Sequence, residues 1–289
     1  MDRDPTTNKY VGFNRKEMGS ETLFGTVKHH DCHAFLVHGD NEAWPSKEFE
    51  KEGGDAASAM QEALTTASGL YKSGVFQFSP GASAVGKVKL NLSEDGARSH
   101  KGDRPGDVLM FPQMRRFRLG DKIGNTSTAV VDFVESCVVR GDDGVDAGGV
   151  DAVEALTGAH VFVCTHGKRD ARCGVCGPSL IDAFRSEIRA MGMDDIVAVR
   201  GCSHTGGHKY AGNVLVFLPD GGVATNSSSE GKNKTKNEDG NGDGNRVKGI
   251  WYGYVTPLEI KSILERTVSR GEIIPVSYTH LTLPTILLV

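Results

Sequence analysis

Two cysteines and two histidines are the residues of this chain best suited to hold a metal. Eight residues separate Cys164 from Cys173, and three separate His204 from His208. Each pair follows a short apolar run rich in β-branched residues, which predicts that each pair comes at the end of a strand. Thiolates combined with imidazoles favour zinc or an iron–sulfur cluster over magnesium or calcium. Structural zinc sites usually have a shorter gap between cysteines than the eight residues found here. A loop of this length can enclose a larger group such as a cluster, but the spacing leaves both zinc and an iron–sulfur cluster open.

Residues near these four have other interpretations. Gly206 and Gly207 favour a loop between the two histidines, because glycine lets the backbone pass close to a bulky group. Cys176 completes a Cys-x-x-Cys pair with Cys173, the layout of a reactive dithiol. If Cys173 binds metal, Cys176 is a packed residue or a substitute ligand, and packing is the interpretation we favour. Asn213 is a candidate hydrogen-bonding residue around the site.

Composition limits the function classes. The chain has 289 residues, 38% of them hydrophobic, and a formal net charge of −4. This charge gives no basic field for nucleic acid. We find no apolar run approaching the roughly 20 residues that span a bilayer. Six scattered cysteines without a secretory signal predict a reducing, cytoplasmic location, where clustered cysteines indicate metal or redox chemistry.

Composition also predicts the domain organisation. The Gly/Asp-rich segment 141–149 is interpreted as a linker between an N-terminal domain, 1–140, and a second domain, 150–275. Within the second domain, 226–245 is too polar to join a core and is predicted to be a disordered insert. The composition changes abruptly at 276–289, which we interpret as a non-native tail.

The second domain reads as a strand, a helix, three strands and a last helix. This order, with mixed parallel and antiparallel strands, is typical of a thioredoxin-like α/β domain. A Thr256-Pro-x-Glu259 signature opens the last helix. The predicted strands are 160–164, 196–199, 213–218 and 249–255, and the predicted helices are 178–191 and the segment from 256 to 264.

The first half is less regular. Residues 33–39 echo 160–167, which suggests a diverged copy of the same fold. A helix over 56–70 and a strand over 108–112 are also predicted. This half lacks a Cys-x8-Cys pair, so it is expected to carry no equivalent metal centre.

Five ordered motifs give the chain a resemblance to a known family. They are residues 12–18 (GFNRKEM), 107–112 (DVLMFP), 164–178 (CTHGKRDARCGVCGP), 202–213 (CSHTGGHKYAGN) and 251–257 (WYGYVTP). Together they resemble the sucrase/ferredoxin-like family, whose members are taken to be thioredoxin-like ferredoxins. The resemblance implies a [2Fe–2S] cluster held by Cys164, Cys173, His204 and His208.

This resemblance predicts an electron carrier more than a substrate-transforming enzyme. Imidazole ligands raise the potential of such a cluster, and electron uptake is expected to be coupled to protonation of His204 or His208. The expected partners are redox donor and acceptor proteins of unknown identity. Two alternatives stay open: a thiol–disulfide oxidoreductase that uses Cys173 and Cys176, and a structural zinc module that uses the four predicted ligands. No motif indicates the paired carboxylates of a glycosidase.

Overall fold

A computed structural model describes residues 13, 27, 30, 32–47, 60–61, 65, 88–119, 150–206, 211–219, 223 and 247–274. Nine strands form one mixed sheet in the order β5-β4-β3-β1-β2-β7-β6-β8-β9. The strands are β1 (Cys32–Val37), β2 (Val88–Ser93), β3 (Asp107–Phe111), β4 (Arg115–Arg118), β5 (Ala152–Ala155), β6 (Ala159–Cys164), β7 (Val197–Cys202), β8 (Val214–Pro219) and β9 (Val247–Tyr252).

The described helices follow the strands of the second half. Helix α3 (Ala171–Ala190) connects β6 to its parallel neighbour β7, and α4 (Ile260–Ser262) continues directly into the π-helical segment η4 (Ile263–Val268). The predicted capping signature forms before α4, because the backbone N–H of Thr256 donates to Glu259 at 2.7 Å.

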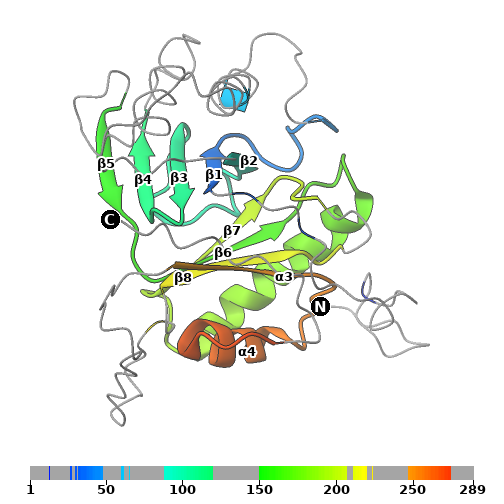
Figure 1. Cartoon of the computed structure of the whole chain (residues 1–289). Coiled ribbons are helices and arrows are strands. Elements are labelled where there is room, and N and C mark those ends of the chain that lie inside the picture. The colour runs from blue at the N-terminus through cyan, green and yellow to red at the C-terminus, as the bar shows by residue number, and fades with distance from the viewer. Residues whose placement is uncertain are drawn as a thin grey trace.

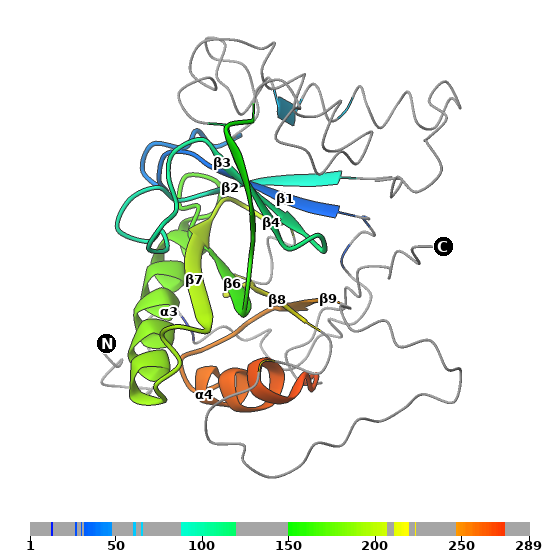
Figure 2. The same cartoon turned by 90° about the vertical axis from the view of Figure 1, so that its left-hand side faces the viewer.

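The sheet bends sharply between β2 and β7, where pairing is limited to Ser93 and Cys202. We name the two parts the N-terminal half-sheet (β5-β4-β3-β1-β2) and the C-terminal half-sheet (β7-β6-β8-β9). The two lie face to face, and the helices cover the outer face of the C-terminal half-sheet (Figures 1 and 2).

Alternation along the strands builds a core on each face of the C-terminal half-sheet. On β6, Val161 and Val163 pack against α3 and α4, whereas Phe162 faces the N-terminal half-sheet. There the ring of Phe162 stacks on Phe35 of β1 at 3.7 Å between centroids. Phe111 of β3 and Phe217 of β8 stack in the same way at 4.3 Å. The two half-sheets therefore share an aromatic core.

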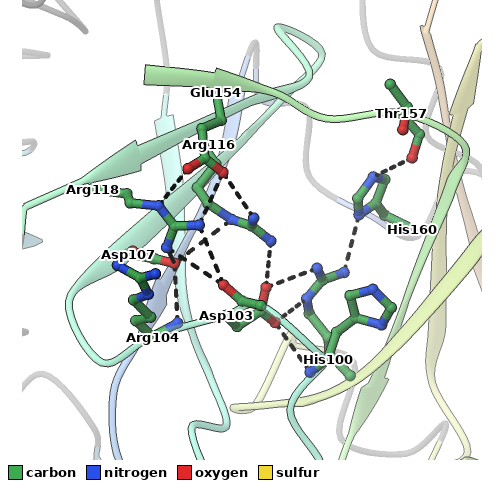
Figure 3. A network of polar contacts seen from close by, with 11 residues as sticks. His100, Asp103, Arg104, Asp107, Arg116, Arg118, Glu154, Thr157 and His160 are labelled. Carbon is green, nitrogen blue, oxygen red and sulfur yellow. Dashed lines mark hydrogen bonds and ion pairs between the residues drawn. The ribbon is translucent and has the colours of Figure 1, made fainter. Parts of the chain in front are cut away.

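A network of charged side chains closes one end of this interface (Figure 3). Arg200 of β7 is fully buried and pairs with Asp103, which also pairs with Arg116 of β4. Arg118 of β4 joins Asp107 to Glu154 of β5. The network thus links strands of both half-sheets. The figure also labels His100, Arg104, Thr157 and His160.

The structure confirms the predicted fold class, an α/β protein with a large mixed sheet consistent with a thioredoxin-like fold. The order of elements predicted for the second half is observed from β6 through η4, and β8 pairs with β9 in antiparallel fashion. The strand predicted over 108–112 is β3. Strands β2, β4 and β5 were not predicted.

The predicted start of the first helix in the second half is wrong. The helix expected to begin at Pro178 begins at Ala171, so Cys173 and Cys176 lie inside it. Asp170 caps this earlier start, because its side chain accepts a hydrogen bond from the backbone N–H of Arg172. Pro178 is tolerated inside the helix at the loss of one backbone hydrogen bond.

Several predictions fall outside the described residues. They are the linker 141–149, the insert 226–245, the tail 276–289 and most of the helix 56–70. The division into domains therefore stays a prediction. Within the described residues, β5 of the predicted second domain pairs with β4 of the first half.

Candidate metal centre

Three of the four predicted ligands meet at one edge of the C-terminal half-sheet. Cys164 is the last residue of β6, Cys173 lies in the first turn of α3, and His204 follows β7. Their ligand atoms all lie within 4.8 Å of one another. The Sγ atom of Cys164 lies 3.9 Å from Nδ1 of His204. Because β6 and β7 are parallel and Cys164 pairs in register with Cys202, the residues that end these strands come to the same edge.

The approach of α3 to this edge depends on two glycines. A Cβ atom on Gly177 would lie 2.3 Å from the carbonyl oxygen of Cys164 and 2.8 Å from Cα of Thr165. A Cβ atom on Gly174 would lie 2.7 Å from Cα of Gly167. The first turns of α3 therefore pack directly on the backbone after β6. This close packing brings Cys173 next to Cys164.

The centre is buried and the two thiols are electrostatically different. Cys164 and Cys173 are both 0% exposed and His204 is 8% exposed. Hydrogen bonding from the Cys173 thiol, with a further contribution from His204, holds the pKa of Cys164 well below its usual range despite burial. The same pairing, together with burial, raises the pKa of Cys173. One thiolate is thus favoured before any metal arrives, and thiolate is the form that binds metal.

Hydrogen bonds hold the loops that carry the ligands. The side-chain amide of Asn213 donates to the carbonyl of Gly206 at 3.3 Å, and the backbone carbonyl of Asn213 accepts from the backbone N–H of Cys164 at 3.1 Å. Asn213 therefore contacts both the histidine loop and the end of β6. His166, inside the cysteine loop, hydrogen-bonds to the carbonyl of Pro45 at 2.9 Å.

The remaining predicted residues are placed as follows. Cys176 is fully buried in the core between α3 and the sheet, in agreement with the packing interpretation. Cys202 faces the aromatic core between the half-sheets. His208 lies outside the described residues, so its predicted role as a ligand stays a prediction.

Two polar residues beside the centre, one on β2 and one directly after it, are not predicted from the sequence. Asn91 donates to the carbonyl of His204, and Glu94 accepts from the hydroxyl of Thr165, which directly follows Cys164. A signal was available: in 88–93 (VKLNLS) a polar residue alternates with apolar ones, a pattern typical of a strand with one polar face. Asn91 and Glu94 are nevertheless buried, at 1% and 0% exposed.

A family model described as sucrase/ferredoxin-like matches residues 23–279 of the chain. The chain belongs to the sucrase/ferredoxin-like family. The resemblance based on the five motifs is therefore confirmed. The three described candidate ligands all lie within the matched region.

Curated relatives share a narrower region. "Altered inheritance of mitochondria protein 32" of Debaryomyces hansenii is 38% identical over 118 residues, which cover 41% of this chain and 34% of the relative. Proteins of the same name from Meyerozyma guilliermondii and Candida glabrata are 32% and 34% identical, over 43% and 42% of this chain and 34% and 32% of those relatives. The chain thus spans about a third of the length of the curated relatives it matches.

These relatives correct the predicted function. Their name refers to the inheritance of mitochondria and does not describe a [2Fe–2S] electron carrier. The prediction that this chain is an iron–sulfur electron-transfer protein is therefore wrong on the comparisons, which support membership of the family alone.

Solved structures and helix hydropathy supply further findings about this chain. No solved structure matches this chain. None of the helices in the described part of the chain combines the length and the hydropathy that a membrane span requires.

Proposed function

We propose that this chain is a metal-binding protein whose centre is formed by Cys164, Cys173 and His204. The observation that carries the proposal is the convergence of two thiols and an imidazole, from three separate elements, within 4.8 Å in a buried position. Bonds from zinc to sulfur and to imidazole nitrogen are about 2.3 Å and about 2.0–2.1 Å long. Two ligands 3.9 Å apart, as Cys164 and His204 are, can therefore share one metal ion.

The occupant that we propose is a [2Fe–2S] cluster. Soft thiolates with imidazoles are ligands that iron–sulfur centres accept, and membership of the sucrase/ferredoxin-like family supports this choice. We propose His208 as the fourth ligand because it lies four residues beyond His204 in the sequence. Such a cluster supplies redox-active iron when bound.

The side chains of the site favour metal binding before a metal is present. Cys164 offers a thiolate, because its pKa is held down by the Cys173 thiol and by His204. Binding of a metal requires Cys173 to lose its proton as well, so loading releases protons. The alternative interpretation, in which these cysteines are only packed thiols, explains Cys176 in its apolar core but not an imidazole nitrogen within 4.8 Å of the thiols of Cys164 and Cys173.

The test is the metal and sulfide content of the purified full chain, together with its visible spectrum. We expect iron and acid-labile sulfide in equal amounts and a coloured protein. Cys164→Ser, Cys173→Ser and His204→Ala should each lose most of the metal. Cys176→Ser is the matched control, since it changes a buried thiol one helical turn from Cys173, and it should keep the metal.

The outcomes discriminate between occupants. A colourless protein with one zinc per chain, lost in the same three variants, would keep the metal centre and replace the cluster. Metal content that is unchanged in both Cys164→Ser and Cys173→Ser would refute the site itself.

Location and partners are also proposals. We propose a cytoplasmic protein that binds neither nucleic acid nor membranes, on the basis of its charge and hydropathy. Because the relatives' name refers to mitochondria, the alternative location to test is the mitochondrion. Fractionation of cells that produce the full chain decides between the cytoplasm and mitochondria.

A further inference from the structure

We propose that Asn91 and Glu94, on and directly after β2, are positioning residues that set the geometry of the metal centre. This inference rests on the proposed function. The three described ligands all belong to the second half of the chain, so the N-terminal half-sheet would contribute to the centre by orienting them.

The two half-sheets meet where β2 pairs with β7. The pairing of β2 with β7 is limited to Ser93 and Cys202, so the two strands separate immediately beside the centre. From there, the chain after β7 is held to β2 by other hydrogen bonds. The backbone N–H of Ser203 donates to the carbonyl of Leu92 at 2.8 Å, and the Ser203 hydroxyl accepts from the Leu92 N–H at 2.9 Å.

Asn91 extends this attachment to a ligand. Its side-chain amide donates to the carbonyl of His204 at 3.0 Å and to the Ser203 hydroxyl at 3.1 Å. Its oxygen accepts from Nε2 of the buried His33 at 2.9 Å. Both ends of the amide are therefore engaged in a buried place, which fixes its orientation. The backbone of His204, and with it the direction from which the imidazole projects, is held by β2.

Glu94 acts on the other strand end. One carboxylate oxygen accepts from the Thr165 hydroxyl at 2.5 Å, and the other lies 3.4 Å from a guanidinium nitrogen of Arg98. The backbone N–H of Glu94 donates to the carbonyl of Gly201 at 3.0 Å. A Cβ atom on Gly201 would lie 2.3 Å from the Glu94 carboxylate, so the missing side chain makes room for this contact.

Together the two side chains connect one strand to both sides of the centre. Asn91 holds the residue that supplies the imidazole, and Glu94 holds the residue after Cys164. Outer groups of this kind orient metal ligands, and their loss typically weakens metal binding by about 10–100-fold. An apolar side chain at position 91 or 94 would lose the hydrogen bonds that hold the loops carrying His204 and Thr165.

The experiment measures metal affinity in the full chain. Wild type, Asn91→Leu, Glu94→Leu and Glu94→Gln are loaded with iron and sulfide, and in parallel with zinc, and are titrated against a chromophoric chelator. Asn91→Leu and Glu94→Leu are expected to bind about 10–100-fold more weakly and to shift the absorption bands of the bound metal. Glu94→Gln keeps an oxygen that accepts from Thr165, so it should restore wild-type affinity.

Far-UV circular dichroism and the melting temperature of the metal-free proteins serve as folding checks. Thr267→Val is the matched control, because Thr267 is buried and its hydroxyl hydrogen-bonds to Tyr252 rather than to the ligand loops. If Asn91→Leu does not fold, Ser203→Ala replaces it, since that variant loses only the hydroxyl that joins Asn91 and Leu92.

Wild-type affinity and spectrum in both leucine variants would overturn the positioning proposal alone, and so would an equal loss in Thr267→Val. Failure of Glu94→Gln to restore affinity would remove Glu94 from the proposal. A wild-type chain that retains neither iron nor zinc would overturn the proposed function, and this inference with it.

Discussion

The guanidinium of Arg200 makes a two-point ion pair with the carboxylate of Asp103, and both side chains are fully buried. The distances are 2.6 Å from Nε to one oxygen and 3.0 Å from Nη2 to the other. Burial alone would raise the pKa of Asp103, but the hydrogen bonds and charge of Arg200, with help from Arg116, hold it below its usual range. The pair joins β7 to the loop before β3 and so connects the two half-sheets.

Removal of one partner should be costly. Arg200→Met leaves Asp103 buried with less compensation, and we expect a loss of about 3–5 kcal/mol in the free energy of unfolding. Urea unfolding of the metal-free protein measures it. Lys261→Ala is the control, because its ion pair with Glu265 is exposed and should contribute below about 1 kcal/mol. A loss as small as that of the control would show that the pair does not hold the half-sheets together.

Acid should destabilise the protein through His160. This imidazole accepts from Arg200 at 3.0 Å on Nδ1 and donates to the carbonyl of Thr157 on Nε2, an arrangement that requires the neutral ring. Burial, and then the charge of Arg200, lower its pKa well below the usual 6.5. Below pH 6.5 the unfolded chain therefore takes up a proton that the folded chain does not, and stability falls toward the folded-state pKa.

The measurement is urea unfolding at several pH values from 7 downward. His160→Gln keeps one donor and one acceptor and removes the titration. Its stability should fall less steeply with decreasing pH, by up to about 1.4 kcal/mol per pH unit. Equal slopes in wild type and variant would contradict the assignment of a neutral buried ring.

Gly177 should be needed for the metal centre. Gly177→Ala places a methyl group 2.3 Å from the carbonyl of Cys164, so α3 must move away from the end of β6. We expect a destabilisation of about 1–3 kcal/mol and loss of metal, because Cys173 moves with the helix. Gly96→Ala is the control, since nothing lies within 4 Å of its Cβ position. Metal content that survives Gly177→Ala would show that the ligands do not require this close packing.

Bound metal should stabilise the fold. Whichever metal the purified chain holds, its removal should lower the melting temperature, because a ligand that binds the folded state alone adds about 2.7 kcal/mol at 100 times its Kd. Differential scanning calorimetry of loaded and metal-free protein measures the shift. Cys164→Ser should melt at the same temperature with and without metal, and a shift that persists in that variant would place the metal elsewhere.

The sequence by itself singles out Cys164, Cys173 and His204 as candidate ligands, and the structure brings these three together. Thiols and imidazoles are chemically distinctive, and the β-branched runs before Cys164 and before His204 are local patterns that predict strand ends. Parallel pairing of β6 with β7 then brings those ends to one edge of the sheet. The capping signature of Thr256 and Glu259 is likewise local, and it forms as expected.

The tertiary structure decided what surrounds the centre and contributed to where α3 begins. Proline is common at a first helical position, so the sequence favoured a start at Pro178. The local cap at Asp170 and the packing of Gly177 on Cys164 accompany a start at Ala171, and only the packing depends on what lies beside the helix. Asn91 is 113 residues away from His204 in the chain, and no local pattern connects them. Their contact exists because the sheet folds back at β2 and β7, and such a bend is set by how two faces pack rather than by the periodicity of either strand.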